Sequence, residues 1–384
     1  MRVERVDASD ARAVLRGLRG AVLGAGPAIA LGADPDAALP SEVPPGTAVV
    51  VTTSGSTGYP KSVALSRSAL TSSALATADR IGMGAWLLAL PPGYIAGVQV
   101  LVRALVAGHE PALVTGPFRV AAFVAAASSL ASSRGGVPVA AYTSLVPAQL
   151  QTLLDDPDPA ARRALTRFVA VLVGGQALAP ALAERAADAG VRVVRTYGSS
   201  ETAGGCVYDG IPLDGVGVRI VDGEVQLSGP MLADGYLGDP ARTDEAFVRD
   251  AAGTRWYRTG DAGGFDGRLT ITGRRDNVIV SGGINVSLDR VERAVRTLPG
   301  FVDAVVVPVP DERWGEASVV VVSERGVGDL AEALRRVRAV VEAEVGVPAR
   351  PRALLPVPEI PLLASGKPDR AALRVLARGD APGR

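Results

Sequence analysis

The chain has 384 residues, of which 48% are hydrophobic, 21% charged and only 4% aromatic. Its 40 basic residues balance its 40 acidic residues, so we expect no overall field that would draw it to nucleic acid or to an anionic membrane. The single cysteine, Cys206, excludes an internal disulfide framework and fits a reducing cytoplasm, while the single histidine, His109, excludes a multi-histidine metal centre.

In chain order, the first elements alternate between helices and strands. We expect a helix over 11–18, then a buried strand over 47–53 that ends in a Gly/Ser-rich loop. The uncharged stretch 81–102 is interrupted by glycines and prolines, which favours a strand, a turn and the start of a buried helix over a membrane span. His109 follows in Ala-Gly-His-Glu-Pro, where we expect a turn without a catalytic role.

A strand over 168–173, a helix that begins at Pro180 and a strand over 191–194 continue this alternation, which predicts a mainly parallel α/β body. Residues 218–227 form a hairpin signature around Asp222-Gly223. From 277 the order is strand, helix, strand, strand, helix, strand. Ser287 is a candidate cap for the first of these helices, and residues 329–345 form the second. We therefore predict a large domain, 1–274, with sheets flanked by helices, and a small mobile α+β domain, 275–384.

The first functional motif is Thr52-Thr-Ser-Gly-Ser-Thr-Gly-Tyr-Pro-Lys61. Backbone N–H groups and hydroxyls of such a loop can wrap a polyphosphate, and the lysine adds charge. The string is not a Walker A loop, because Pro60 stands where that pattern needs glycine. The predicted phosphate-binding residues are Thr53, Ser54, Gly55, Ser56, Thr57, Gly58 and Lys61.

This string resembles the signature loop of the adenylate-forming superfamily, and four further segments resemble that superfamily's other motifs in order. Tyr197-Gly-Ser-Ser-Glu-Thr202 is the first of these. The resemblance implies that Tyr197 lies against adenine, with Gly198 also in the nucleotide site, that Thr202 contacts phosphate, and that Glu201 holds Mg²⁺, a hard cation that prefers carboxylate oxygens. Gly174 and Gly175 are also assigned to the nucleotide site.

Tyr257-Arg-Thr-Gly-Asp261 resembles the ribose-binding motif, in which one carboxylate accepts hydrogen bonds from both ribose hydroxyls. The segment 273–286 resembles the junction of the two domains. The resemblance implies that Arg274 lies near the ribose, that Asp276 is the hinge, and that Gly282 and Gly283 line a thiol channel, where glycine permits close backbone approach.

Pro361-Leu-Leu-Ala-Ser-Gly-Lys-Pro-Asp-Arg370 resembles the superfamily's catalytic-lysine motif. A cation is needed where negative charge concentrates at the α-phosphate, which makes Lys367 the candidate. Trp314, in Asp311-Glu-Arg-Trp-Gly-Glu316, is similar to a tryptophan that lies near the coenzyme A nucleotide in acyl-CoA synthetases; packing under a hairpin is the structural alternative.

More narrowly, the segments 144–150, 173–178 and 201–210, with the short front end, resemble the compact o-succinylbenzoate–CoA ligases. That substrate is an aromatic dicarboxylate, which needs an apolar slot and a cationic or hydrogen-bonding group for the carboxylate that is not activated. For Arg103 the alternative is a helix-surface position. The candidate substrate-binding residues are Tyr94, Gln99, Arg103, Ser144, Gln176, Ser199 and Gly204.

The resemblance implies an ATP- and Mg²⁺-dependent acid–CoA ligase that forms an acyl-AMP and then a coenzyme A thioester. Two alternatives stay open: a ligase for another aryl or short-chain acid, which shares the ATP motifs, and a nucleotide-binding homologue without catalysis. The sequence leaves the oligomeric state open, a homodimer included.

Overall fold

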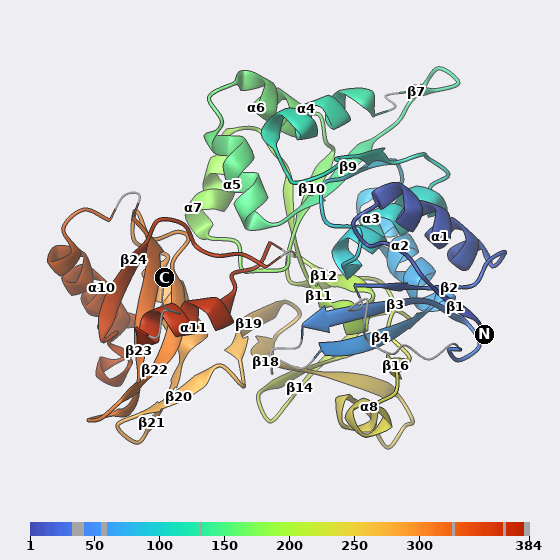
Figure 1. Cartoon of the computed structure of the whole chain (residues 1–384). Helices are drawn as coiled ribbons and strands as arrows, with labels where there is room; N and C mark the ends of the chain where they lie inside the picture. Colours follow the sequence, from blue (N-terminus) through green and yellow to red (C-terminus); the bar gives the residue numbers. More distant parts are fainter. Residues whose placement is uncertain (33–41, 55–59, 131–132, 325–326, 364–365, 380–384) are drawn as a thin grey trace.

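The computed structural model describes residues 1–32, 42–54, 60–130, 133–324, 327–363 and 366–379. Figure 1 shows a large domain that carries the N-terminus and, beside it, a smaller domain formed by the C-terminal part of the chain. No helix in these ranges is long and apolar enough to cross a bilayer.

The first sheet of the large domain holds the predicted phosphate loop. Its strands, in spatial order, are β1 (Val3–Arg5), β2 (Ala28–Leu31), β3 (Thr47–Ser54), β4 (Pro60–Ser66) and β16 (Gly235–Tyr236). The first three strands are parallel, whereas β4 and β16 are antiparallel to their neighbours. Helix α1 (Ala11–Leu23) packs its apolar side on this sheet, so the predicted helix and strand are both confirmed.

The second sheet has seven strands. They are β13 (Ile211–Pro212), β12 (Gly204–Tyr208), β11 (Val193–Ser199), β10 (Ala170–Val173), β9 (Ala141–Leu145), β5 (Ala85–Leu88) and β6 (Ala112–Leu113). The strands from β6 to β11 are parallel, but β12 and β13 are antiparallel. The prediction of a mainly parallel body is therefore confirmed for these two sheets. Each sheet has antiparallel strands at one edge, because hairpins return the chain directly beside β3 and β11.

Helices cover both faces of this second sheet. On one face lie α2 (Arg67–Ile81) and α3 (Ile95–Val106), which share an apolar core with the first sheet. On the other face lie α4 (Val120–Ser129), α5 (Pro147–Asp155), α6 (Pro159–Thr166) and α7 (Pro180–Asp188), which share a second core. A short hairpin of β7 (Ser133–Arg134) and β8 (Val137–Pro138) projects from this layer (Figure 1).

The third sheet is antiparallel. Its strands are β14 (Gly217–Val221), β15 (Glu224–Ser228), β18 (Arg255–Phe265) and β17 (Phe247–Arg249), with β19 (Leu269–Arg274) on β18. The predicted hairpin is confirmed: Asp222 and Gly223 both have positive φ, 49° and 76°, as a tight turn of this kind requires. Helix α8 (Pro240–Ala246) precedes β17.

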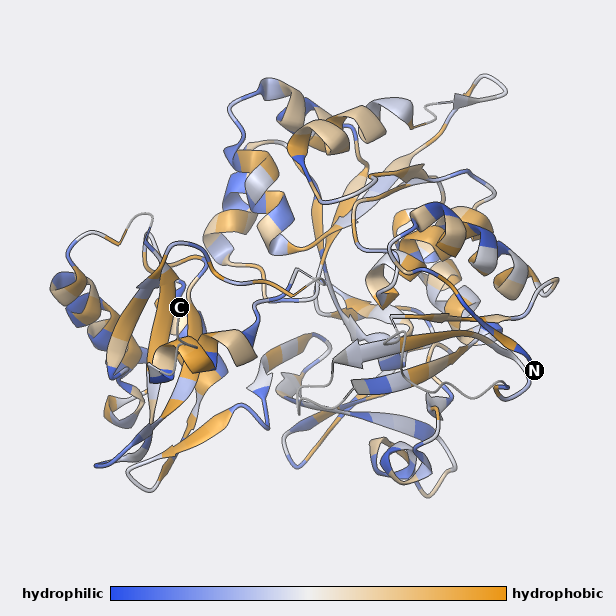
Figure 2. Cartoon of the chain, viewed as in Figure 1, coloured by the Kyte–Doolittle hydropathy of each residue, from blue (hydrophilic) through white to orange (hydrophobic). Residues whose placement is uncertain are grey.

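The small domain has one sheet in the order β21 (Ile284–Ser287), β20 (Val278–Ser281), β23 (Gly315–Ser323) and β22 (Val305–Asp311), with β24 (Ala353–Val357) on β23. The helices are α9 (Leu288–Val295), α10 (Leu330–Glu344) and α11 (Arg370–Arg378). Its strands are mostly apolar (Figure 2) and bury separate cores on their two faces. The predicted element order needs two corrections: the first strand is a hairpin of two strands, and a final helix follows β24.

Candidate active site

A partly buried ion pair joins the first sheet to the turn after β11. The Nζ atom of Lys61, on β4, lies 2.7 Å from Oε1 of Glu201, in the short 3-10 turn η1 (Ser200–Thr202). Burial alone would raise the pKa of Glu201, but the Lys61 ammonium outweighs burial and holds that pKa below its usual range. Glu201 is therefore an ionised carboxylate at neutral pH.

Tyr236 completes this pair and was missed in the sequence. Its hydroxyl donates to Oε1 of Glu201 at 2.9 Å and accepts from Nζ of Lys61 at 3.2 Å. Burial and the Glu201 carboxylate both raise the pKa of Tyr236, so the phenol keeps its proton. Tyr236 reaches the site because β16 pairs with β4, and no local pattern in the sequence signals that pairing.

The phosphate loop connects two antiparallel strands. Thr53 lies opposite Lys61 in the β3–β4 register, and its hydroxyl donates to the Lys61 carbonyl oxygen at 3.5 Å. Ser54 is the last residue of β3. The predicted loop residues Gly55, Ser56, Thr57 and Gly58 lie outside the described residues.

Thr202 has a different place from the one that the resemblance implied. Its side chain is fully buried, and its hydroxyl accepts from the N–H of Ser199 at 2.8 Å and donates to the Gly204 carbonyl oxygen at 2.8 Å. Thr202 thus stabilises the turn that presents Glu201 and is enclosed within it.

A second cluster lies where β18 pairs with the end of β19. Tyr197 donates to Oδ2 of Asp261 at 2.6 Å, and Nη1 of Arg274 donates to Oδ1 at 3.2 Å. Arg274 also binds both carboxylate oxygens of Asp276, each at 3.0 Å. Burial raises the pKa of Asp261, while Tyr197 and Arg274 oppose that rise. The predicted adenine, ribose and hinge residues therefore share one hydrogen-bonded network.

The lysine loop of the small domain docks on the large domain. Nε2 of Gln176 donates to the carbonyl oxygen of Gly366 at 3.2 Å, and Gly366 lies against Val146. The Lys367 side chain is exposed and extends toward Gly175, where an added Cβ would lie 3.8 Å from its Cε. Surrounding protein lowers the pKa of Lys367, but the nearby carboxylates of Glu201 and Asp261 oppose this. Gln176, predicted to bind substrate, here holds the lysine loop.

Gly282, Gly283 and Trp314 lie elsewhere. The N–H of Gly282 donates to the Trp314 carbonyl oxygen at 2.9 Å, and the indole packs on Gly282 while remaining 45% exposed. The β20–β21 hairpin, which contains the two glycines, lies at the end of the small domain that is remote from the large domain (Figure 1). Lys367 occupies the interdomain site in this arrangement, and the glycine turn does not.

Unpaired buried atoms mark the other side of the site. Among the described residues, five buried side-chain atoms have no hydrogen-bond partner, and four belong to predicted substrate-binding residues. These four are Gln99 Oε1, Arg103 Nε, Ser144 Oγ and Ser199 Oγ. A buried polar atom without a partner costs free energy, so this concentration favours a site where a ligand supplies the partners.

Arg103 is the most informative of the four. It lies one helical turn after Gln99 on α3, so the two side chains share a face, and Gln99 in turn contacts Gly204. Arg103 is 6% exposed, and no carboxylate among the described residues pairs with it. Burial lowers the pKa of Arg103, although a guanidinium stays protonated. The helix-surface alternative for Arg103 is therefore wrong.

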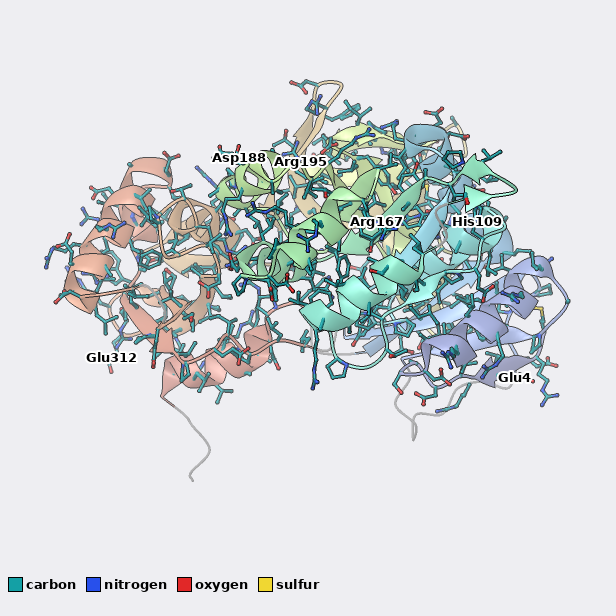
Figure 3. The ribbon with its side chains drawn as sticks, turned by 90° about the horizontal axis from the view of Figure 1, so that it is seen from above. Glu4, His109, Arg167, Asp188, Arg195 and Glu312 are labelled. Carbon is teal, nitrogen blue, oxygen red and sulfur yellow. The ribbon has the colours of Figure 1, made fainter. Side chains whose placement is uncertain are left out.

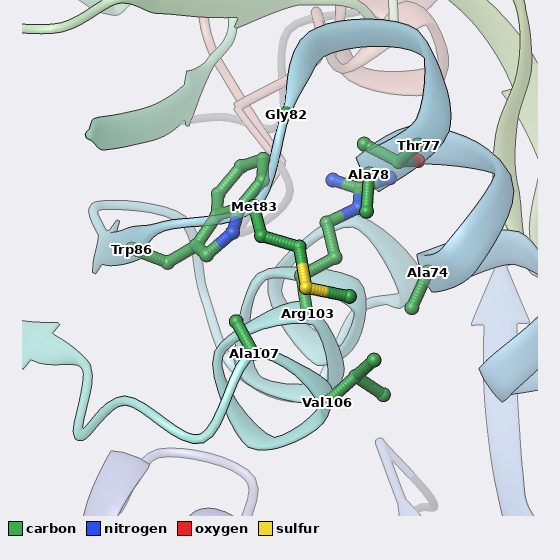
Figure 4. Close-up of a pocket in the computed structure, with 9 residues that line it drawn as sticks. All are labelled: Ala74, Thr77, Ala78, Gly82, Met83, Trp86, Arg103, Val106 and Ala107. Carbon is green, nitrogen blue, oxygen red and sulfur yellow. The ribbon is translucent and has the colours of Figure 1, made fainter. Parts of the chain in front are cut away.

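Figure 4 shows Arg103 extending from α3 toward Thr77, with Trp86 and Met83 nearby. Its guanidinium carbon lies 5.1 Å from the centre of a Trp86 ring, which is within cation–π range. Tyr142 stacks on Trp86, and Ser144, two residues further along β9, points to the same face of the sheet. Tyr94 is the half-buried residue that precedes α3. Most of the predicted substrate residues thus gather between α3 and the second sheet.

His109 lies on the side of the large domain away from the small domain (Figure 3). Within the described residues, no group of three His, Cys, Asp or Glu side chains is arranged to hold a metal ion. A cation at this site would therefore rely on Glu201 and on oxygens of a ligand, an arrangement that suits Mg²⁺.

Comparisons with known proteins identify the family. The profile of the AMP-binding enzyme family matches residues 8–273, and that of the AMP-binding enzyme C-terminal domain matches residues 290–367. The chain is 44% identical over 334 residues to the probable 2-succinylbenzoate–CoA ligase of Mycobacterium tuberculosis, covering 85% of this chain and 83% of that protein. It is 34% identical over 302 residues to the 2-succinylbenzoate–CoA ligase of Salmonella typhimurium, covering 74% of this chain and 60% of that protein.

Two solved structures share the fold over most of the chain. The amide bond synthetase McbA from Marinactinospora thermotolerans aligns with a TM-score of 0.73 and 28% identity, covering 92% of this chain and 76% of that one. A variant of Escherichia coli MenE with bound OSB-AMS aligns with a TM-score of 0.70 and 27% identity, covering 90% and 72%. The family match, the motif order and the convergence of Lys61, Glu201 and Lys367 lead to one conclusion: the chain belongs to the family of AMP-binding, adenylate-forming enzymes.

Proposed function

We propose that the chain is an AMP-forming acid–CoA ligase that converts 2-succinylbenzoate into its coenzyme A thioester through an acyl-AMP. The choice of substrate rests on Arg103: its guanidinium is buried and has no acidic partner in the described part of the chain. A buried cation is stable only when it is paired, so its counter-ion is best supplied by the ligand. A second carboxylate on the substrate meets that need.

ATP would bind where the two clusters and the lysine loop meet. Lys61 would bind the phosphates, Tyr197 would lie against adenine, and Asp261 with Arg274 would bind the ribose hydroxyls, a proposal that their two clusters support. Glu201 would hold Mg²⁺, which neutralises phosphate charge when bound. Within the first half-reaction, the Lys367 ammonium stabilises the negative charge that develops as the acyl carboxylate attacks the α-phosphate.

The acyl group would extend from Lys367 past Gly204 and Gln99 toward Arg103. Trp86 and the apolar residues of α3 provide the apolar wall, and the unpaired atoms of Gln99, Ser144 and Ser199 provide hydrogen-bonding capacity. An acid with an aromatic ring between two carboxylates matches this layout. The names of the relatives at 44% and 34% identity support the same substrate.

For the second half-reaction, we assign residues 1–274 and 275–384 to two domains that rotate about Asp276. Rotation would withdraw Lys367 and bring Gly282 and Gly283 to the site, with Trp314 near the coenzyme A nucleotide. The thiolate would then displace AMP. A polar hinge supports this assignment, since Asp276 is bound to Arg274 and is not part of an apolar core. The single buried thiol, Cys206, fits a cytoplasmic protein.

The test is coenzyme A-dependent AMP formation with 2-succinylbenzoate against benzoate, succinate and short fatty acids. We expect selective turnover, with AMP formation lost in Lys367→Ala. Arg103→Gln should raise KM for 2-succinylbenzoate roughly 10- to 150-fold, because losing a hydrogen bond to a charged group weakens binding by about that factor. The matched control is Arg80→Gln, an arginine at the partly exposed end of α2. Turnover with another acid alone would overturn the substrate assignment, and absence of AMP formation with every acid would overturn the ligase.

A further inference from the structure

The guanidinium of Arg103 is held by one neutral side chain. Its Nη2 donates to the hydroxyl of Tyr208, on β12, at 3.2 Å, and this is its only hydrogen bond among the described residues. Trp86 lies against the guanidinium but fixes only its distance from the ring. The orientation of the guanidinium group therefore depends on Tyr208.

The hydrogen bonds behind Tyr208 have a defined direction. Thr77 donates its only hydroxyl hydrogen to the Ser73 carbonyl oxygen at 2.9 Å. The 2.9 Å bond between Thr77 and Tyr208 must then use the Tyr208 hydrogen, since each hydroxyl has one. Tyr208 consequently keeps its lone pairs toward Arg103, and it accepts from Nη2.

The chain of bonds continues to the active-site turn. The Ser73 hydroxyl donates to the carbonyl oxygen of Ala203 at 3.0 Å. Ala203 has a left-handed backbone with φ of 46° and stands between Thr202 and Gly204. The bonds from Arg103 to Tyr208, from Tyr208 to Thr77 and from Thr77 to the Ser73 carbonyl oxygen run in one direction, so they can polarise one another. The Ser73 hydroxyl adds a separate bond to the turn. The chain links α3, β12 and α2 to the turn that carries Glu201.

The three hydroxyl residues of this chain of bonds are enclosed. Tyr208, Thr77 and Ser73 are at most 2% exposed, so water does not compete for their hydrogen bonds. Without the Tyr208 hydroxyl, Nη2 would lose its acceptor, and the long arginine side chain would gain rotamer freedom. A carboxylate that needs the guanidinium at one place would then lose affinity, whereas a substrate without that carboxylate would not.

We infer that Tyr208 is a specificity-determining residue: with Thr77 behind it, Tyr208 positions Arg103 and so sets the preference for acids that carry a second carboxylate. Tyr208 acts through Arg103 and is a positioning residue. The inference rests on the proposed function, because it takes Arg103 as the group that binds the second carboxylate.

The experiment compares Tyr208→Phe with Tyr142→Phe. Tyr142 is a matched control: it is buried, stacks on the same Trp86, and donates to the Ile81 carbonyl oxygen without contacting Arg103. The substrates are 2-succinylbenzoate and its two monocarboxylate analogues, 4-oxo-4-phenylbutanoate and 2-butanoylbenzoate. kcat and KM are measured for each pair, together with KM for ATP.

We expect Tyr208→Phe to lower kcat/KM for 2-succinylbenzoate roughly tenfold, mainly through KM. The kcat/KM for whichever monocarboxylate analogue the enzyme activates, and the KM for ATP, should stay nearly unchanged. Tyr142→Phe should leave the preference between acids unchanged. In Arg103→Gln, adding Tyr208→Phe should cause little further loss, since both changes remove one interaction. Thr77→Val, which leaves the Tyr208 hydroxyl in place but removes its acceptor, should give a smaller shift of the same kind.

The outcomes distinguish a failure of the role proposed for Arg103 from a failure of the role inferred for Tyr208. If Arg103→Gln leaves the preference for the dicarboxylate intact, the proposed role of Arg103 fails. If Arg103→Gln abolishes that preference but Tyr208→Phe behaves like Tyr142→Phe, the inference about Tyr208 fails alone. An equal loss for all acids in both Tyr208→Phe and Thr77→Val would show a structural role and overturn the inference.

Discussion

Arg370 and Glu292 form an ion pair of 2.7 Å between the segment that carries Lys367 and helix α9 of the small domain. Glu292 is buried, accepts from the N–H of Val306 at 3.0 Å and forms a further ion pair of 2.9 Å with Arg296. A second bond runs from Arg370 to the Val306 carbonyl oxygen at 2.9 Å. Arg370 thereby fixes the start of α11, three residues after the candidate catalytic lysine.

This relationship predicts a defect that is confined to one half-reaction. In Arg370→Met, formation of acyl-AMP should fall roughly a hundredfold, because a displacement of about 1 Å of a catalytic group has that effect. Conversion of supplied acyl-AMP into thioester, which does not need Lys367 at the site, should change little. Arg374→Met, on the exposed side of the same helix, is the control. Equal losses in both half-reactions would contradict the prediction.

The Lys61–Glu201 pair predicts a pH-dependent contribution to stability. Because the folded-state pKa of Glu201 lies below its ordinary 4.5, the pair stabilises the protein above pH 4.5, and this contribution is lost as pH falls through the lowered pKa. Lys61→Met should therefore lower the free energy of unfolding by about 2 kcal/mol at pH 7 and by less at pH 3. Urea unfolding at several pH values measures the difference in the free energy of unfolding between the parent and Lys61→Met. The control is Arg80→Met, which removes a more exposed ion pair. A difference that does not vary with pH would refute the assignment.

Gly198 predicts a steric requirement in the turn that presents Glu201. A Cβ at this position would lie 2.1 Å from the carbonyl oxygen of Gly204. Gly198→Ala should lower the free energy of unfolding by about 1–3 kcal/mol, as overpacking does, and should abolish acyl-AMP formation. Gly264→Ala, where an added Cβ meets nothing within 4 Å, should stay within about 0.5 kcal/mol of the parent. The prediction fails if both variants are equally stable and active.

The thiol of Cys206 is expected to be unreactive in the folded protein and reactive once the protein unfolds. Burial raises its pKa from 9.0 to about 12, so at pH 8 only about one thiol in ten thousand is ionised in the native protein. A thiol-reactive chromophore should therefore label the native protein very slowly. It should label the urea-unfolded protein rapidly, with one label bound per chain. Rapid labelling of the native protein at pH 8 would show that Cys206 is accessible.

Most of the residues that were found from the sequence lie at or beside a strand end. Lys61 stands at the start of β4, Glu201 follows β11 and Arg274 ends β19. Asp261 lies inside β18, opposite Arg274. A local pattern is enough to locate such residues, because the chemistry and the turn are encoded together. Thr202 shows the limit of this reasoning: its hydroxyl satisfies the turn itself, which a pattern of hydroxyl residues does not reveal.

The residues that were missed reach the site through long-range pairing. Tyr236 meets Lys61, 175 positions away, only because β16 adds to the edge of the first sheet. Tyr208 meets Arg103 across 105 positions, between β12 and α3. Nor could periodicity assign Arg103 to the interior, because a charged residue in a helix is normally exposed. Only the packing of α2, α3 and the second sheet decides its burial.

The apolar cores of the chain divide at the junction between the two domains. In the described residues, the clusters of the large domain end at Leu269, and those of the small domain begin at Ile279. Across the junction run polar bonds, such as that from the backbone of Arg274 to Asp289 at 2.6 Å. Each half can therefore melt as its own cooperative unit, so heating should give two calorimetric transitions, and a ligand that bridges the halves should merge them into one.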